Sequence, residues 1–188
     1  MSPPVPGGWD ATAAVAGRPL IPWRGDLWRA HKRRYDATDA SGSRLFSARY
    51  HRAPDLFPSG PTWAALYCAL SYGVCLGEVL RHVTPELLPA LRDQRLSRLA
   101  VDLSAVLDCR DVAALGVPPD VLFHDTDYTP GQALGFAAIA RGCEGLLIPS
   151  ATRLPDDVLV IFPDNLRSTS RIEVVETVDP ILYTERSP

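Results

Sequence analysis

The sequence predicts a single α+β domain. Its 188 residues suit one domain of slightly more than average size, with enough chain to bury a substantial core. Short apolar segments typical of strands are mixed with segments that carry helix-start signals, and both ends of the predicted order are rich in strands. No internal repeat is visible, which argues against a solenoid or propeller.

Composition narrows the function classes. Apolar residues make up 46% and charged residues 22% of the chain, as in ordinary globular proteins. A net charge of −3 gives no support to binding of nucleic acid or of an anionic membrane. The first twenty residues have no basic segment before an apolar run, and no run is long enough to cross a bilayer, so we expect a cytoplasmic protein.

The cysteines and histidines show no metal-site spacing. No CxxC pair occurs, and the cysteines stand among apolar neighbours, so we expect buried, reduced thiols and no bound metal. The residues concerned are Cys68, Cys75, Cys109, Cys143, His31, His51, His82 and His124.

The first third of the chain predicts an arm, three strands and a loop. Residues 1–22 are rich in Pro, Gly and Ala and indicate a flexible N-terminal arm. Strands are expected over residues 26–30, 44–51 and 64–69. Three prolines between residues 52 and 62 indicate an irregular loop.

The middle of the chain predicts a helix that Ser71 caps and that runs to about His82. A second short helical piece is expected over residues 84–94, and a strand over residues 96–104. The segment 104–117 fits neither period and stays open.

The clearest helix start is "TPGQALGFAAIARG". We expect Thr129 as the N-cap, Pro130 at the first helical position and Gln132 as the capping-box partner, with Gly142 ending the helix. The remaining elements are expected strands over residues 144–150, 157–162 and 170–178 and a polar tail over residues 184–188, which leaves residues 23–183 as the folded domain.

Glu78 is the one charge between Trp63 and Leu80, in a segment otherwise suited to a core. An ionised carboxylate buried without a partner costs several kcal/mol or has its pKa forced up. Glu78 therefore lies either on an exposed helix face, beside Arg81 and His82, or in a cleft that uses it.

Four other residues have ordinary structural interpretations when taken alone. Arg29 and Arg49 would be surface arginines, Tyr67 a core aromatic, and Ser150 a turn serine beside a proline. Their order along the chain, together with Glu78, carries more information than any one of them.

That ordered set resembles the RES domain, the family that supplies the toxins of RES–Xre toxin–antitoxin systems. The resemblance covers roughly residues 27–165. It rests on Arg29 in "LWRA", Arg49 in "ARYH", Tyr67 in "LYCA", Glu78 in "CLGEV" and Ser150 in "LIPS".

The sequence also departs from the family pattern. Ala48 stands where a glycine is usual, Ile148 stands where a tyrosine is usual, and Arg153 lies one place later than expected. The loop over residues 52–62 is longer than usual, and the N-terminal arm is additional.

The resemblance implies a fold similar to ADP-ribosyltransferases, with a split mixed sheet and short helices around a nucleotide cleft. It implies NAD as a substrate, with no separate cofactor, and cleavage of the nicotinamide–ribose bond by hydrolysis or phosphorolysis. The residues it assigns to catalysis are Arg49, Tyr67, Glu78 and Ser150, and those it assigns to substrate binding are Arg29, Tyr50 and Arg153.

These residue types fit that chemistry. Guanidinium groups make forked, charge-assisted contacts with phosphate, so we expect Arg29 and Arg49 to line one cleft. Breaking an N-glycosidic bond develops positive charge on the ribose, which a carboxylate such as Glu78 can stabilise.

The resemblance further implies an Xre-type helix-turn-helix antitoxin as partner, and the apolar C-terminal half suggests a homodimer or an antitoxin-binding face. Two other functions remain open. One is an ADP-ribosyltransferase acting on a macromolecule, with the basic stretch over residues 31–35 near its acceptor. The other is a non-catalytic regulatory module on the same scaffold.

Overall fold

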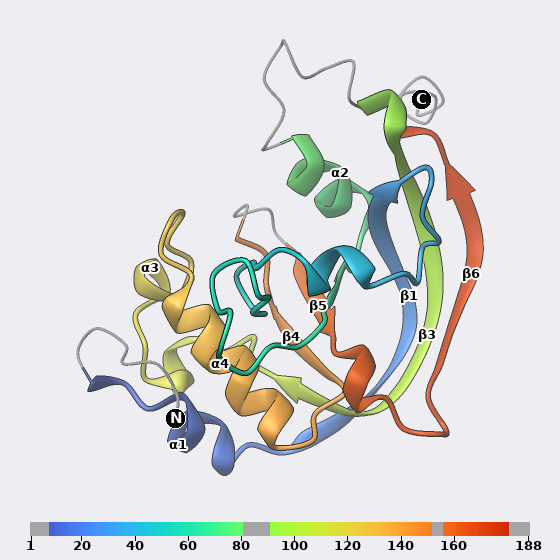
Figure 1. Cartoon of the computed structure of the whole chain (residues 1–188). Coiled ribbons are helices and arrows are strands. Elements are labelled where there is room, and N and C mark those ends of the chain that lie inside the picture. Colours follow the sequence, from blue (N-terminus) through green and yellow to red (C-terminus); the bar gives the residue numbers. More distant parts are fainter. Residues whose placement is uncertain (1–7, 81–90, 152–155, 181–188) are drawn as a thin grey trace.

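The computed structural model describes residues 8–80, 91–151 and 156–180 (Figure 1). They form one α+β domain, as predicted. The strands are β1 (Leu20–Lys32), β2 (Leu66–Ala69), β3 (Gln94–Asp108), β4 (Gly145–Pro149), β5 (Asp157–Ile161) and β6 (Arg171–Val178). The helices are α1 (Ala11–Ala16), α2 (Tyr72–Leu80), α3 (Pro119–Leu122) and α4 (Thr129–Ala140), with short 3-10 turns η2 (Ser41–Arg44), η4 (Ala113–Leu115) and η5 (Pro163–Asn165).

The described strands form one mixed, strongly curved sheet in the order β1-β2-β5-β4-β3-β6. Strand β3 also pairs with β1 along almost its whole length, so the pairings close into a ring from β1 through β2, β5, β4 and β3. On its other edge, β3 pairs with two different strands. Its first half (Leu96–Asp102) pairs with β6, and its second half (Val106–Asp108) pairs with β4. The β3–β4 pairing is parallel and the others are antiparallel, which makes the sheet mixed.

The surroundings of strand β4 explain why its sequence is continuously apolar rather than alternating between apolar and polar residues. Leu146 and Ile148 pack in the same buried cluster as Leu134 of α4, whereas Leu147 packs in a second cluster with Leu99 of β3. Both faces of this part of the sheet are therefore buried, which removes the need for polar residues on one face. Figure 1 shows α4 lying across the sheet, with α1 beside one end of α4 and α2 at the other end of the molecule.

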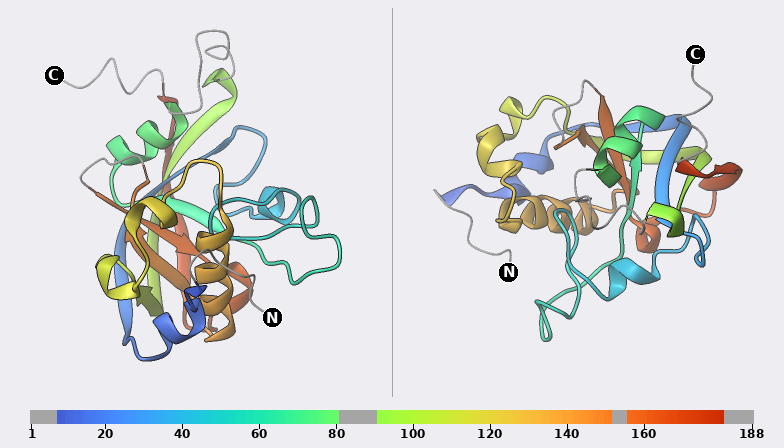
Figure 2. Two further views of the ribbon diagram at one scale, coloured as in Figure 1. Left: turned by 90° about the vertical axis from the view of Figure 1, so that its left-hand side faces the viewer. Right: turned by 90° about the horizontal axis from the view of Figure 1, so that it is seen from above.

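The N-terminal segment corrects one prediction. Residues 11–22, which we expected in a flexible arm, form α1 and the start of β1. Asp10 caps α1 by accepting hydrogen bonds from the amides of Thr12 (2.9 Å) and Ala13 (3.2 Å). Val15 is buried against α4, and the turn that follows α1 lies at the end of the domain where α4 finishes (Figure 2). Residues 1–7 lie outside the described part.

Most predicted strands are confirmed, but the one expected over residues 44–51 is wrong. The chain there forms η2 and then a tight turn, closed by a β-bridge between Ala48 and His51. The backbone of this turn packs on α4 instead of joining a sheet. The predicted segment 84–94 and the tail 184–188 fall mostly or wholly outside the described residues.

Helix α4 ends as predicted but begins differently. Gly142 has φ of +77°, the left-handed conformation expected of a residue that ends a helix. At the other end, Thr129 is already helical and its amide donates to Asp127 Oδ1 (2.9 Å). Gln132 makes no capping box, because its side-chain amide donates to the carbonyl of Ala48 at 3.2 Å.

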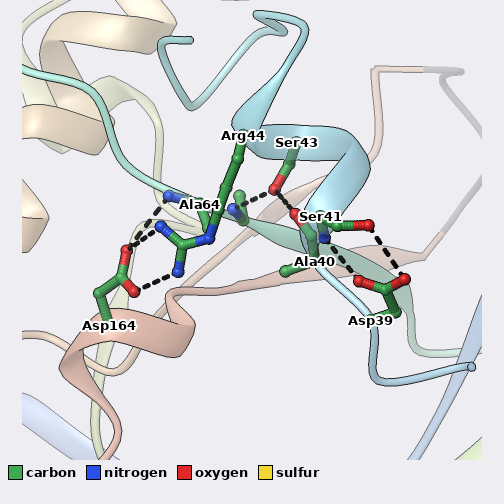
Figure 3. Close-up of polar contacts among 8 residues, drawn as sticks. Asp39, Ala40, Ser41, Ser43, Arg44, Ala64 and Asp164 are labelled. Carbon is green, nitrogen blue, oxygen red and sulfur yellow. Dashed lines mark hydrogen bonds and ion pairs between the residues drawn. The ribbon is translucent and has the colours of Figure 1, made fainter.

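The long excursion between β1 and β2 is tied down at η2 and just before β2 (Figure 3). Asp164 of η5 accepts hydrogen bonds from the Arg44 guanidinium (2.5 Å to Oδ1) and from the amide of Ala64 (3.4 Å to Oδ2). Ser43 Oγ accepts from the amide of Ala65 (3.0 Å) and donates to the carbonyl of Ala40 (2.7 Å). These contacts close residues 44–64 into a loop that contains the turn at residues 48–51.

Candidate active site

A cavity of about 330 Å³ lies between the end of the sheet, α2 and the turn at residues 48–50. Its walls come from β1, β2, β5, α2 and the segments that precede α4 and follow β4. Aromatic rings form much of the lining, and Arg49 and Glu78 bring charged groups to it. A pocket with mostly apolar walls and a few convergent polar groups is the usual form of a small-molecule site.

Glu78 reaches the cavity because of where α2 begins. Ser71 caps α2 as predicted, since its Oγ accepts from the amide of Val74 at 3.3 Å. Glu78 lies one turn after the buried Val74 and is therefore half-buried on the inner side of the helix. The interpretation of Glu78 as an exposed surface residue is not met, and Arg81 and His82 lie outside the described residues.

Ser150 supplies a partner for this carboxylate. It follows β4, is buried, and its Oγ donates a hydrogen bond of 2.8 Å to Glu78 Oε1. The polar pair thus links the end of the sheet to α2, on the wall that Pro149 and Ala151 also line.

Arg49 also lines the cavity and is itself buried. Its Nη1 donates to the carbonyls of His124 (2.7 Å) and Leu122 (3.2 Å). The guanidinium carbon lies 4.9 Å from the centroid of the Tyr128 ring, in cation–π contact. Arg49 therefore joins the turn at residues 48–51 to the segment before α4.

Two glycines of α4 explain how this turn comes so close. A Cβ atom at Gly131 would lie 2.4 Å from the carbonyl oxygen of Arg49, and one at Gly135 would lie 2.1 Å from that of Tyr50. Any side chain at either position would push the turn off the helix. The spacing of four residues puts both glycines on one face, a pattern that allows close backbone approach and that was visible in the sequence.

Tyr50 and Tyr67, which the resemblance assigns to the site, both line the cavity. Their rings are stacked with centroids 6.3 Å apart, and Tyr67 Oη accepts from the amide of Tyr50 at 2.9 Å. Burial raises the pKa of both phenols, so both stay protonated at neutral pH. Tyr50 Oη is buried with no hydrogen-bond partner among the described residues.

Arg29 does not join the others, so the prediction that it shares a cleft with Arg49 is wrong. Its guanidinium donates to the carbonyls of Ala37 and of Asp39 (2.8 Å), which holds the loop after β1. Burial lowers the pKa of Arg29. The neighbours of Arg29 on β1, Trp28 and Ala30, line the cavity, because side chains alternate between the faces of a strand.

Arg153, which the resemblance assigns to substrate binding, lies outside the described residues. Sequence reasoning missed Trp28 and Tyr128, which both line the cavity. The alternation of β1 could have found Trp28, whose ring packs edge-on against Tyr72 at 5.1 Å. No comparable signal marked Tyr128, because its position depends on the contact with Arg49.

Two of the four buried free cysteines also border the cavity. Burial raises the pKa of Cys68 and Cys75 to about 12, so these thiols are protonated and poor nucleophiles. Among the described residues, no group of three or more His, Cys, Asp or Glu side chains is arranged to hold a metal ion.

The fold and site together define a single-domain α+β protein with a carboxylate-bearing cleft at the end of a curved mixed sheet. The chain belongs to the RES domain family, whose model matches residues 26–183. Its structure is similar to a chain of the crystal structure of the M. tuberculosis MbcT–MbcA toxin–antitoxin complex. The TM-score is 0.76 and the identity 25%, over 94% of this chain and 96% of that one.

The search of curated proteins found no match to this chain. In the part of the chain that the structure describes, no helix has the length and hydrophobicity needed to cross a membrane.

Proposed function

We propose that this chain is the toxin of a toxin–antitoxin system and that it degrades NAD by cleaving the nicotinamide–ribose bond. Membership of the RES domain family and the similarity to a toxin–antitoxin complex support the toxin role. The observation that carries the chemistry is the half-buried Glu78 carboxylate, held by Ser150 on the wall of an aromatic cavity.

In the proposed reaction the C–N bond between ribose and nicotinamide breaks, and its electron pair leaves with the nicotinamide. The ribose becomes positively charged as this happens, in the manner of other glycoside cleavages. Glu78 stabilises that charge from a fixed position, and Ser150 keeps the carboxylate oriented. A water molecule, which loses a proton to solvent, or a phosphate ion then adds to the ribose carbon. The products are nicotinamide and either ADP-ribose or its 1″-phosphate.

The rest of the cavity suits such a substrate. Arg49 brings positive charge to a wall that the pyrophosphate of NAD can approach. Trp28, Tyr50, Tyr67 and Tyr128 offer flat apolar surfaces for a planar ring. NAD would be the substrate, and the proposal needs no separate cofactor.

We further propose an Xre-type antitoxin as the partner and the cytoplasm, where NAD is available, as the place of action. Association of two copies of the chain is a separate proposal, and light scattering of the purified protein tests it. The toxin role is tested by expressing the chain alone and with the regulator encoded beside it. Growth arrest relieved by the regulator supports the role, and growth unaffected by the chain alone contradicts it.

The chemistry is tested by incubating purified protein with NAD, with and without phosphate, and separating the products. Release of nicotinamide with ADP-ribose indicates hydrolysis, and phosphate-dependent formation of the 1″-phosphate indicates phosphorolysis. Labelled ADP-ribose appearing on protein or nucleic acid would replace this proposal with a transferase. NAD left intact under all conditions would contradict enzymatic NAD cleavage.

A further inference from the structure

The main chain of Tyr50 is held by two side chains, one bonded to its amide and one bonded to its carbonyl. Its amide donates to Tyr67 Oη at 2.9 Å, and its carbonyl accepts from Trp63 Nε1 at 3.0 Å. The same carbonyl lies against Gly135 of α4. Because Arg49 and Tyr50 form part of the cavity wall, these contacts set the shape of that wall.

His51, the next residue, contacts both the Tyr67 hydroxyl and the carbonyl of Phe46. It is buried, and its Nε2 lies 2.7 Å from the carbonyl oxygen of Phe46. A carbonyl can only accept a hydrogen bond, so Nε2 carries the hydrogen. Burial lowers the pKa of His51, and the ring is therefore neutral, which leaves Nδ1 without a hydrogen and able to accept.

The hydrogen of the Tyr67 hydroxyl has its acceptor there. His51 Nδ1 lies 3.0 Å from Tyr67 Oη, so the hydroxyl donates to His51 while its oxygen accepts from the Tyr50 amide. The three groups form a directed chain from the Tyr50 amide through Tyr67 to His51 and on to Phe46. The Tyr67 hydroxyl therefore fixes the main chain of Tyr50 in the cavity wall. Because its hydrogen is bonded to His51, it cannot donate that hydrogen to a substrate.

We propose that His51 is a positioning residue of the active site, which acts by orienting the Tyr67 hydroxyl toward the main chain of Tyr50. The proposal rests on the proposed function, because the wall that His51 sets is the wall of the NAD-cleaving site. It gives Tyr67 a different role from the one that the resemblance implies, since the hydroxyl makes its hydrogen bonds to the protein.

Asparagine and leucine are nearly equal in shape, and only asparagine can accept a hydrogen bond from Tyr67. His51→Asn and His51→Leu therefore form a matched pair. We expect His51→Leu to lower kcat/KM for NAD about tenfold, as for loss of one buried hydrogen bond, and His51→Asn to restore activity to within a few-fold of wild type. Equal losses in the two variants would overturn the proposal.

A double-substitution cycle tests whether His51 acts through Tyr67. Tyr67→Phe combined with His51→Leu should be no worse than the more harmful single change, because both interrupt the same chain. Losses that multiply would show independent roles and overturn the proposal. Tyr35→Phe, on an exposed tyrosine, is the control for substitution at a phenol.

The final test does not depend on NAD. Nitrogen-15 NMR of the histidine rings should show His51 as the neutral form with hydrogen on Nε2, and Tyr67→Phe should shift the Nδ1 resonance. A hydrogen on Nδ1, or an Nδ1 resonance unmoved by Tyr67→Phe, would overturn the proposal. Wild-type protein that shows this signature but leaves NAD intact would contradict the proposed function alone.

Discussion

Ser150 Oγ donates a hydrogen bond of 2.8 Å to Oε1 of Glu78, across 72 positions of the sequence. The bond joins the segment after β4 to α2 and orients a carboxylate that lines the cavity. Its existence explains how an acidic residue persists in a largely apolar helical segment, because the charge is both partnered and placed at a cleft.

Ser150→Ala removes this donor and leaves the carboxylate free to turn. Hydrogen bonds to charged groups contribute about 1.5–3 kcal/mol, so we expect turnover of NAD to fall roughly ten- to a hundredfold with little change in KM. Steady-state kinetics measure this, and the exposed Ser168→Ala provides the matched control. A Ser150→Ala enzyme as active as that control would separate the serine from catalysis.

Gly131→Ala and Gly135→Ala test the close contact between α4 and the turn at residues 48–51. Alanine favours a helix by about 1 kcal/mol over glycine, but here the new Cβ would overlap a carbonyl oxygen. We expect both variants to melt at a lower temperature and to lose activity, because the wall carrying Arg49 and Tyr50 is displaced.

Gly73→Ala is the control for that pair. Gly73 lies in α2, and the position that a Cβ atom would take there has no atom within 4 Å apart from its chain neighbours and the backbone of its own helix. Alanine should therefore leave stability unchanged or raise it by up to about 1 kcal/mol. Thermal melting of the three variants decides the matter. Gly135→Ala as stable as Gly73→Ala would show that the turn can move away without cost.

Arg49→Lys should be harmful although it keeps the charge. A lysine ammonium is a point charge and cannot combine the flat contact with Tyr128 and the bonds to the carbonyls of Leu122 and His124. We expect kcat/KM for NAD to fall at least about tenfold. The same change at Arg24, which is 82% exposed, should have no effect, and equal activity in the two variants would argue against a role for the guanidinium.

Glu144, which is not among the residues that line the cavity, should make the stability of the fold sensitive to acid. It is fully buried, and although burial opposes its ionisation, hydrogen bonds from Ser170, Arg167 and Ser104 lower its pKa to about 2 from an ordinary 4.5. A carboxyl whose pKa is lower in the folded state stabilises the fold fully above pH 4.5. That stabilisation is lost as the pH falls from about 4.5 toward 2.

Glu144→Gln should therefore destabilise the protein by about 1–3 kcal/mol at pH 6, because the amide cannot accept from all of these donors. Its free energy of unfolding should also fall less than that of wild type between pH 5 and pH 3, about the range of the titration. Denaturant unfolding at the two pH values measures both quantities. Parallel losses in wild type and variant would remove Glu144 from the acid response.

The sequence predicted the elements whose signals are local. The strands over residues 26–30 and 96–104 were visible as apolar runs, and the cap of Ser71 and the terminating Gly142 as single-residue signals. The local signals left Glu78 open between an exposed helix face and a cleft, and the resemblance favoured the cleft; in the structure Glu78 lines the cavity. Apolar pattern alone could not say how far β1 and β3 extend, because the polar ends His31–Lys32 and Gln94–Arg95 are held by pairing with each other.

The parts that sequence reasoning missed depend on contacts between distant segments. Arg49 looked like a strand residue, yet its position comes from two glycines of α4 more than eighty residues away. Arg29 looked equivalent to Arg49, and only the folded loop at Ala37 shows that its donors are used there. No local sequence pattern marked His51, because its contact with Tyr67 forms only when the turn at residues 48–51 is folded.

Glu78→Gln tests the central claim most directly, through paired measurement of NAD turnover and thermal stability beside wild type. Glutamine keeps the size of the side chain and removes the charge that would oppose the developing positive charge on the ribose. The account predicts a loss of about 2.7–4 kcal/mol in transition-state stabilisation, roughly a hundred- to a thousandfold in kcat, with an unchanged or slightly raised melting temperature. Retained turnover with unchanged melting would contradict it.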